Sequence, residues 1–262
     1  MSLFLVDSHC HLDRLDLTPF DGELQGALDL AAEQGVGHML CVCIDLEHFN
    51  DVLKPAQNHA NISASVGVHP NENVKTEPTI EELLHLAADK NVVAIGETGL
   101  DYFRSEGDLD WQRERFRTHI RAAKECQKPL IIHMRDAAED TLRILQEENA
   151  AEVGGVMHCF TENREIAQRA LDLNFMISFS GIVTFNSAKE LKEVAKYVPA
   201  DRMLVETDSP YLAPVPFRGK PNQPAYVTHV AAHVAELRET TIEEIAQHTT
   251  ENYFSLFGGR PM

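Results

Sequence analysis

The feature that most constrains the fold of this chain is an alternation, repeated eight times, of short apolar segments with longer amphipathic segments. The short segments are rich in Val, Ile and Phe, which is typical of strands, and the longer segments have the spacing of helices that bury one face. Eight such units in one continuous array predict a parallel sheet that closes on itself. The expected fold class is therefore α/β, a (β/α)8 TIM barrel.

The expected elements follow directly from this alternation. Strands are expected at residues 4–9, 38–44, 62–70, 92–101, 129–135, 154–160, 175–183 and 203–210. Helices are expected at about 22–34, 46–59, 79–88, 108–126, 137–148, 163–173, 187–197, 224–237 and 242–257. No linker or repeat divides the chain, so we expect one domain over residues 1–262. An open doubly wound sheet is the alternative, but it usually carries a GxGxxG turn after its first strand, where this chain has His-Cys-His.

The first expected strand ends in two histidines, within the stretch FLVDSHCHLD. Side chains alternate between the faces of a strand, so Asp7, His9 and His11 are expected to point the same way. Two imidazoles on one face can bind one metal ion, although histidines at a strand end can also make ordinary hydrogen bonds. Other strands would have to supply the remaining ligands.

Four further candidate ligands each lie near the end of an expected strand, where the chemistry of a TIM barrel gathers. They are Glu97, His133, His158 and Asp208. A lone carboxylate such as Glu97 costs several kcal/mol to bury in an apolar run unless it is paired. Glu206 is expected on the same strand face as Asp208, one layer deeper, where it would orient a ligand or pair with a buried cation.

Six candidate ligands exceed what one catalytic ion normally takes, so the set predicts two divalent ions that share a carboxylate. His9, His11 and Asp208 would hold the first ion, His133 and His158 the second, and Glu97 would bridge them. Zinc, manganese and magnesium all remain open, because imidazole favours zinc and carboxylate favours the other two. Two such ions roughly 3.5–4 Å apart would activate a water molecule as a nucleophile.

Other side chains are candidates for acid–base chemistry or substrate contact. Asp208 is the expected general base. His69 ends the third strand, Tyr102 lies just past Glu97 and could stack on a base or hydrogen-bond a phosphate, and Arg135 follows His133 and could grip a phosphate. Arg218 lies in a proline-rich segment, 214–224, that we expect as a loop over the barrel mouth. Structural roles remain open for all four.

Charge and composition exclude some classes of partner. With 23 Lys and Arg against 41 Asp and Glu, the formal net charge is −18, which argues against general affinity for nucleic-acid backbones or anionic membranes. Two divalent ions held by two carboxylates would still leave a local charge of about +2 that attracts a phosphate. No secretory signal or membrane-length apolar run is present, and five cysteines suggest reduced thiols. We therefore expect a cytoplasmic protein.

The segments that carry these residues resemble a known family over essentially the whole chain. They are DSHCHLD, GVHP, GETGLDY, HMRDA, HCFT, FSGIVTF and ETDSPYLAPVPFRGKPNQP. In order and spacing they resemble the TatD-type metal-dependent hydrolases of the amidohydrolase superfamily, and they are most similar to the YcfH-like bacterial subgroup. The resemblance implies a metallo-dependent hydrolase barrel with its metal ligands at His9, His11, Glu97, His133, His158 and Asp208.

The same resemblance implies an activity. It implies hydrolysis of phosphodiester bonds, with DNA as the partner and 3′-to-5′ exonuclease activity of a deoxyribonuclease on single strands. Two alternatives remain open, namely a hydrolase of amides or esters, such as aminoacyl esters, and a non-catalytic metal-binding protein. We expect a monomer, because no expected helix carries an additional apolar stripe.

Overall fold

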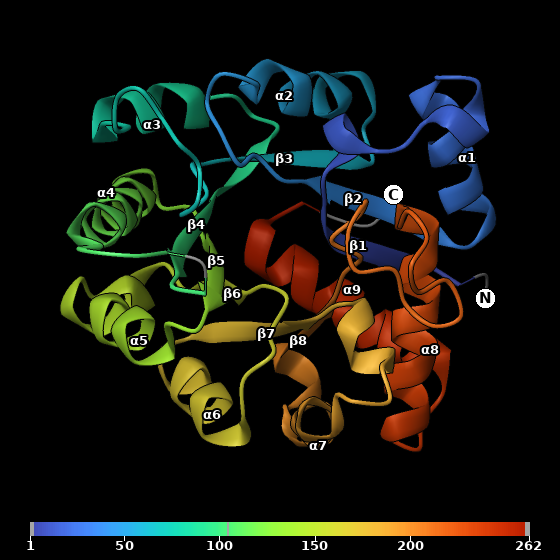
Figure 1. The fold of residues 1–262 in the computed structure, drawn as a ribbon. Helices are drawn as coiled ribbons and strands as arrows, with labels where there is room; N and C mark the ends of the chain where they lie inside the picture. Colours follow the sequence, from blue (N-terminus) through green and yellow to red (C-terminus); the bar gives the residue numbers. More distant parts are fainter. Residues whose placement is uncertain (1–2, 104, 260–262) are drawn as a thin grey trace.

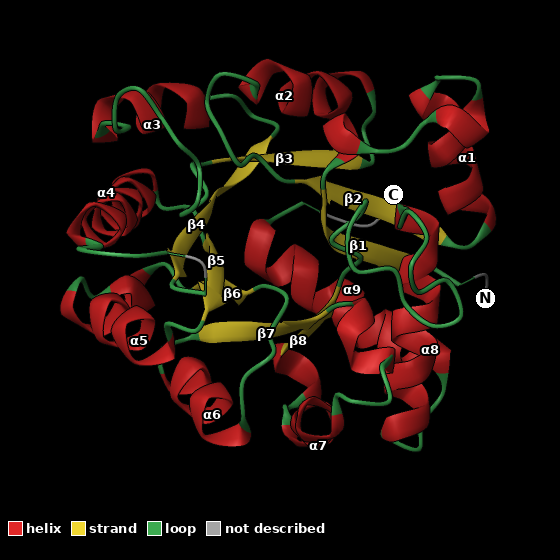
Figure 2. Cartoon of the chain, viewed as in Figure 1, coloured by secondary structure: helices red, strands yellow, loops and turns green. Residues whose placement is uncertain are grey.

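The computed structural model describes residues 3–103 and 105–259, and it has a ring of eight parallel strands surrounded by helices (Figures 1 and 2). The strand order in the sheet follows the chain from β1 to β8. The strands are β1 Leu5–Cys10, β2 Val36–Cys41, β3 Ile62–Val66, β4 Val92–Asp101, β5 Leu130–Arg135, β6 Gly155–Met157, β7 Phe175–Phe179 and β8 Met203–Val205. The prediction of a TIM barrel is confirmed, while the outermost residues of the expected 1–262 domain lie outside the described residues.

The helices lie at the positions expected from the amphipathic segments. They are α1 Leu24–Glu33, α2 Phe49–Asn58, α3 Ile80–Ala87, α4 Asp110–Cys126, α5 Ala138–Glu147, α6 Arg164–Asp172, α7 Lys189–Tyr197, α8 Val227–Leu237 and α9 Ile242–Phe257. Three of them begin at a residue whose side chain accepts a hydrogen bond from the backbone three residues later, namely Thr79, Asn163 and Thr241. Such N-caps satisfy a backbone donor that the first turn of the helix leaves free.

The ring closes where the first strand meets the segment after the last one. The backbone N–H of Asp208 donates to the His9 carbonyl at 2.9 Å, and the N–H of His11 donates to the Ser209 carbonyl at 2.8 Å. These two hydrogen bonds bring residues near position 10 beside residues near position 208. Barrel closure therefore assembles side chains that lie about 200 positions apart in the sequence.

One end of the barrel is sealed by α9, which lies across the middle of the ring in Figure 1. Its Tyr253 and Phe257 belong to a buried cluster with residues of the strands, including Val6 and Leu204. Asn252 Nδ2 donates to the Met203 carbonyl at the start of β8, so α9 caps the amino ends of the strands. The carboxyl ends remain available for a site, as in other TIM barrels.

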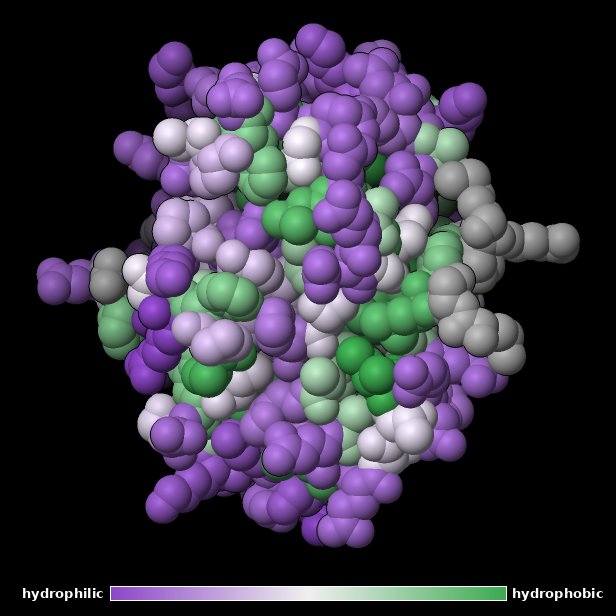
Figure 3. Space-filling model, turned by 90° about the vertical axis from the view of Figure 1, so that its right-hand side faces the viewer, coloured by the Kyte–Doolittle hydropathy of each residue, from purple (hydrophilic) through white to green (hydrophobic). Residues whose placement is uncertain are grey.

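The outer surface reflects the amphipathic helices. On the face that includes α1 and α8, hydrophilic residues project around the margin and hydrophobic ones form separate patches between them (Figure 3). Among the described residues, no helix has the length and apolar character needed to cross a bilayer.

Gly99 in β4 is a position where only glycine fits, which gives a test of the fold. A Cβ atom there would lie 2.0 Å from the His133 carbonyl oxygen, and the backbone φ is +139°. Gly99→Ala should therefore lower the free energy of unfolding by about 3 kcal/mol or more, measured by urea denaturation. Gly107→Ala is the matched control, because Gly107 also has a positive φ but has open space around it. The control should lose only about 1 kcal/mol, and equal losses in both variants would contradict this account.

Candidate metal centre

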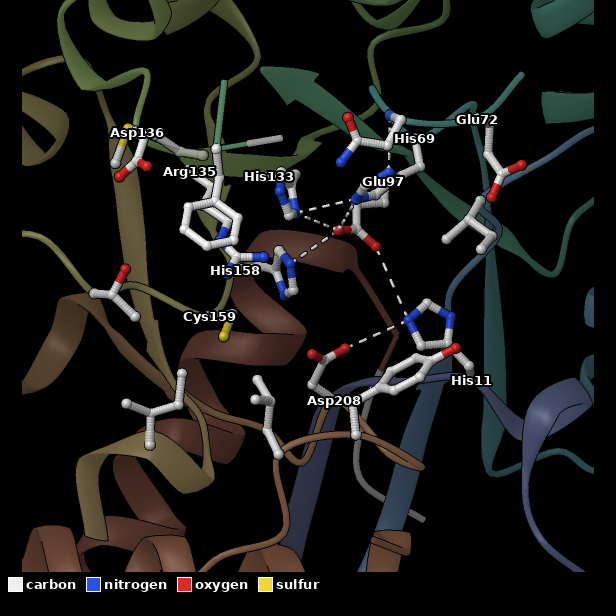
Figure 4. A pocket seen from close by; sticks show the side chains of 18 of the residues that line it. His11, His69, Glu72, Glu97, His133, Arg135, Asp136, His158, Cys159 and Asp208 are labelled. Atoms are coloured by element: carbon white, nitrogen blue, oxygen red, sulfur yellow. Dashed lines mark hydrogen bonds and ion pairs between the residues drawn. The ribbon is translucent and has the colours of Figure 1, made fainter. Parts of the chain in front are cut away.

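Glu97 lies at the middle of the open end of the barrel, between two groups of histidines (Figure 4). Its Oε1 is 2.9 Å from His158 Nε2 and 3.0 Å from His133 Nδ1. Its Oε2 is 3.3 Å from His9 Nε2 and 3.9 Å from His11 Nε2. The two oxygens of one carboxylate thus face two different sets of imidazole nitrogens, which is the arrangement a shared ligand requires.

Asp208 lies on the side of Glu97 where the first strand ends. Its Oδ1 is 3.4 Å from His11 Nε2 and 3.7 Å from His9 Nε2. The ligand atoms of His9, His11 and Asp208 all lie within 4.8 Å of one another, and so do those of His69, Glu97 and His133. The side chain of Asp208 is 14% exposed and lines the cavity above, so it can contact both a buried ion and a molecule in that cavity.

The residues present fit a divalent cation. His9 is fully buried, and its ring stacks on the ring of His158 with centroids 3.8 Å apart. Among the described residues, His9 Nδ1 has no hydrogen-bond partner, and Nε2 faces the Glu97 and Asp208 carboxylates at 3.3 and 3.7 Å. A buried polar atom without a partner costs free energy, and coordination of a cation by a ring nitrogen removes that cost. Imidazole and carboxylate together are the donors that zinc and manganese accept.

The charge of the two carboxylates is maintained despite their burial. Burial alone would raise the pKa of Glu97, but the neighbouring His158 holds it well below its ordinary value. Burial likewise opposes ionisation of Asp208, and the hydrogen bond with His11 lowers the pKa of that carboxyl overall. Both groups are therefore negatively charged at neutral pH and suited to hold cations.

Glu206 lies beneath the centre and forms a hydrogen bond with the ring of His158. It is fully buried, and its Oε1 accepts hydrogen bonds from His158 Nδ1 at 3.1 Å and from the Cys159 N–H at 2.8 Å. With Nδ1 fixed in this way, His158 presents Nε2 to Glu97. Burial would lower the pKa of His158, but Glu97 and Glu206 raise it well above its ordinary value. The structure thus places Glu206 where a residue that orients a metal ligand should lie.

Glu206→Gln should weaken metal binding by about 10- to 100-fold, because the amide supports the histidine less well than the carboxylate does. The measurement is the affinity for Mn²⁺ from calorimetric titration of metal-stripped protein. Glu125→Gln on the exposed face of α4 removes the same charge and should leave the affinity unchanged. Equal affinities in wild type and Glu206→Gln would contradict the orienting role.

A second carboxylate, that of Asp101, contacts His133 on the opposite side of the ring from Glu97, and the sequence analysis missed it. His133 lies between Glu97 and Asp101, with its Nε2 3.0 Å from Asp101 Oδ2. Asp101 also accepts a hydrogen bond from Asn71 Nδ2 at 2.9 Å. The signal was present in the sequence, because Asp101 is four residues after Glu97 in one strand and so shares its face.

His69 lies at the edge of the centre. Its Nε2 is 3.2 Å from His133 Nδ1 and 3.6 Å from Glu97 Oε1, and its Nδ1 accepts the N–H of Asn71 at 3.1 Å. Burial lowers the pKa of His69 to about 3, so the ring is neutral at pH 7. Because Nδ1 is an acceptor, the one ring proton lies on Nε2. His69 is therefore placed as a hydrogen-bond donor toward the centre.

Asp7 does not join His9 and His11, contrary to the strict alternation expected. The pairing of β1 with β2 shifts register between Asp7 and Cys10. Both carboxylate oxygens of Asp7 are bound by Thr207, at 2.8 Å from its N–H and 2.6 Å from its hydroxyl. Burial raises the pKa of Asp7 to about 8. The two histidines share the site, while Asp7 joins β1 to the chain after β8.

The centre opens into a cavity of about 710 Å³. Its apolar walls include Ile44, Phe103, Met134, Ile182 and Leu212, and its charged lining outside the centre consists of Glu72, Arg135, Asp136 and Glu162. The guanidinium of Arg135 lies 3.8 Å from the centre of the Phe103 ring. Among the described residues, no carboxylate is within ion-pair distance of Arg135, so its charge is available to a molecule in the cavity.

Two of the four predicted substrate contacts lie outside this cavity. Tyr102 follows Asp101 and therefore points to the other face of β4, where its hydroxyl donates to Asp140 at 2.7 Å and accepts from Arg113 at 3.0 Å. Arg218 lies over the Phe185 ring at 4.4 Å and does not line the cavity. Direct substrate contact by these two residues is not supported by their placement. His69 and Arg135 do line the cavity.

A TIM barrel with histidines and carboxylates gathered at the carboxyl ends of its strands defines the class of metal-dependent hydrolases. Residues 6–258 match the family model described as TatD related DNase, and the chain belongs to this family. The predicted family is thereby confirmed.

Individual relatives agree with this assignment. The chain is 50% identical over 256 residues to a protein from Escherichia coli K12 called "uncharacterized metal-dependent hydrolase YcfH", covering 97% of this chain and 96% of that protein. It is 44% identical to the metal-dependent hydrolase YabD of Bacillus subtilis, covering 97% and 98% of the two chains. The crystal structure of YjjV, a TatD homologue from Escherichia coli, superposes with a TM-score of 0.91 at 30% identity, covering 99% and 100%.

Proposed function

We propose that this metal-dependent hydrolase is a deoxyribonuclease that cleaves phosphodiester bonds and releases nucleotides from the 3′ end of single-stranded DNA. The observation that carries the proposal is the position of Glu97, whose two carboxylate oxygens face two separate groups of histidines below an accessible cavity. This arrangement suits two cations, and two-cation sites are well matched to the negative charge of a phosphodiester.

Two divalent ions, Mg²⁺, Mn²⁺ or Zn²⁺, would fit the six candidate ligands. His9, His11 and Asp208 would hold one of them, His133 and His158 would hold the other, and Glu97 would serve both. Once bound, the ions supply Lewis acidity at the phosphate and lower the pKa of water.

The chain's own side chains position the substrate and move its proton. Asp208, ionised and partly exposed to the cavity, accepts the proton of the attacking water molecule. Arg135 binds nonbridging oxygens of the scissile phosphate through its planar guanidinium. His69 donates a hydrogen bond from Nε2 to a substrate oxygen. Each of these groups lines the same cavity.

The acidic residues of the cavity wall support action at a chain end. Glu72, Asp136 and Glu162 line the cavity, and Arg135 is the one Lys or Arg among the described residues that do so. A long polyanion would be repelled by such a wall, and the net charge of −18 adds to the repulsion. A single terminal phosphodiester needs only the centre and Arg135.

The same acidic wall favours one other candidate activity. An aminoacyl ester carries a positively charged amino group, which Glu72, Asp136 or Glu162 could bind while the ester carbonyl lies at the centre. Hydrolysis of aminoacyl esters is therefore the second candidate, and the choice between the two rests on a substrate comparison.

The test is incubation of 3′-labelled and 5′-labelled single-stranded DNA with metal-stripped protein plus Mg²⁺, Mn²⁺ or Zn²⁺. The wild-type protein should release mononucleotides from the 3′ end, and His158→Ala, purified identically, should not. Asp172→Asn, an exposed change on α6, should behave as wild type. If wild type and His158→Ala act alike with every ion, the nuclease proposal is wrong, and a panel of aminoacyl esters becomes the relevant assay.

A further inference from the structure

A second cavity, of about 560 Å³, adjoins the active-site cavity and shares Asn71 and Glu72 with it. It lies between the segment after β3 and the first turn of α4, and Trp111 forms part of its wall. None of its lining residues is a candidate metal ligand. The two shared residues place it directly beside the cavity above the metal centre.

Trp111 is the single tryptophan of the chain, and its position is unusual for so large an apolar side chain. The residue is 43% exposed, although it stands in a wall of the cavity. The guanidinium carbon of Arg115 lies 5.0 Å from the indole centroid. A cation over the ring fixes the indole, which leaves a preformed aromatic surface beside the active site.

All three guanidinium nitrogens of Arg115 donate hydrogen bonds within the protein. Its Nε and Nη2 each donate to the Glu77 carboxylate at 2.7 Å, and its Nη1 donates to the carbonyls of His69 at 2.9 Å and Glu72 at 3.0 Å. The residue is only 3% exposed. One buried guanidinium thus connects the indole to the segment that carries His69, and it has no free charge for a phosphate.

The remaining lining of this cavity consists of Val74, the uncharged polar residues Asn71, Asn73 and Ser105, and the carboxylates of Glu72 and Glu77. Asn71 Nδ2 and the Ser105 hydroxyl already donate to Asp101, so these two residues offer a ligand their acceptor oxygens, and Asn73 adds an amide. Among the described residues of the lining, Arg115 is the one basic side chain. Such a lining suits a neutral, planar, hydrogen-bonding ligand and disfavours an anion.

We propose that this second cavity binds a nucleoside of the substrate, with its base stacked on Trp111, while the adjoining phosphodiester lies at the metal centre. Stacking on an aromatic side chain tolerates any base, because every base has a π face. The amide and hydroxyl groups serve the base edge and the sugar. This inference deepens the proposed nuclease function and rests on it.

The single tryptophan makes direct binding measurable without any hydrolysis. Metal-stripped full-length protein is titrated with thymidine and adenosine while the tryptophan fluorescence is followed, with deoxyribose and inorganic phosphate as matched probes. Both nucleosides should quench the fluorescence in a saturable manner, and neither deoxyribose nor phosphate should do so. Quenching by deoxyribose alone, or no quenching by nucleosides, would overturn the proposal.

Kinetics of two substrates supply the second measurement. With thymidine 5′-(p-nitrophenyl phosphate), Trp111→Ala should raise KM about 10-fold with little change in kcat, whereas Trp111→Phe should restore most of the affinity. With methyl p-nitrophenyl phosphate, which lacks a nucleoside, the two variants should match wild type. Equal losses on both substrates would overturn the nucleoside site.

The two proposals can fail separately. Saturable quenching by nucleosides without phosphodiester hydrolysis would overturn the nuclease function and leave the nucleoside site intact. Phosphodiester hydrolysis without quenching by nucleosides would overturn the nucleoside site and leave the nuclease function intact.

Discussion

Replacing Glu97 with glutamine is expected to reduce kcat/KM by about 10³-fold or more. Glutamine keeps the shape of the side chain but removes its charge, and its amide nitrogen cannot bind a cation. The oxygens of Glu97 lie 2.9 Å from His158 Nε2 and 3.3 Å from His9 Nε2, so the substitution affects both groups of histidines. A cation at such a site contributes several kcal/mol to transition-state stabilisation, and each 1.36 kcal/mol is about tenfold in rate.

The measurement pairs activity with metal content in the same protein samples. Glu97→Gln should retain at most one ion per chain after dialysis, wild type should retain two, and circular dichroism should show that the variant is folded. Glu125→Gln, which removes an equal charge from the exposed face of α4, should keep full activity. Unchanged activity and metal content in Glu97→Gln would disprove a shared carboxylate.

Asp208→Asn is expected to lower kcat by about 10²- to 10⁴-fold, the range that removal of a positioned general base produces. The reason is that Asp208 is ionised and partly exposed to the cavity, while Glu97 is only 3% exposed. Asparagine preserves the size of the side chain and one oxygen for contact with His11, but it cannot accept a proton at neutral pH.

Steady-state kinetics with saturating metal separate this effect from a simple loss of ions. A fall in kcat that excess Mn²⁺ does not reverse supports proton transfer by Asp208. Full recovery of kcat at high Mn²⁺ would instead restrict the residue to metal binding. Asp172→Asn on α6 removes an exposed carboxylate that does not line the cavity and should show neither effect.

The barrel could be predicted from the sequence because its pattern is long and regular. Eight apolar segments separated by amphipathic ones leave few other arrangements, and the ends of β4, β5 and β8 were identified from single polar residues in apolar runs. The closure of the ring near Asp208 follows from the fold alone. The proximity of His9, His11 and Glu97 was thus predictable from the sequence.

Other features depend on details that periodicity does not encode. The register shift in β1 separates Asp7 from His9, and no sequence pattern marks where such a shift occurs. Tyr102 was expected to contact the substrate. Because it directly follows Asp101, its side chain points to the opposite face and contacts Arg113 and Asp140. The same alternation places Asp101 on the face of β4 that carries Glu97, and therefore near His133 on the neighbouring strand.

The loop after β8 shows another limit of sequence reasoning. A proline-rich segment over the barrel mouth was expected to bring Arg218 to the substrate. The cavity is instead lined by Tyr211 and Leu212 from the start of this loop, while Arg218 lies over Phe185. Loop conformation depends on tertiary contacts such as the hydrogen bond from the Val215 N–H to the Thr184 hydroxyl, and these are not local in sequence.

The most direct test of the central claim, that Glu97 is shared by two divalent ions, is anomalous diffraction from crystals grown with Mn²⁺. The account predicts two anomalous peaks about 3.5–4 Å apart, one between Glu97 and the pair His9 and His11, the other between Glu97 and the pair His133 and His158. A single peak, or peaks that Glu97 does not contact, would contradict it.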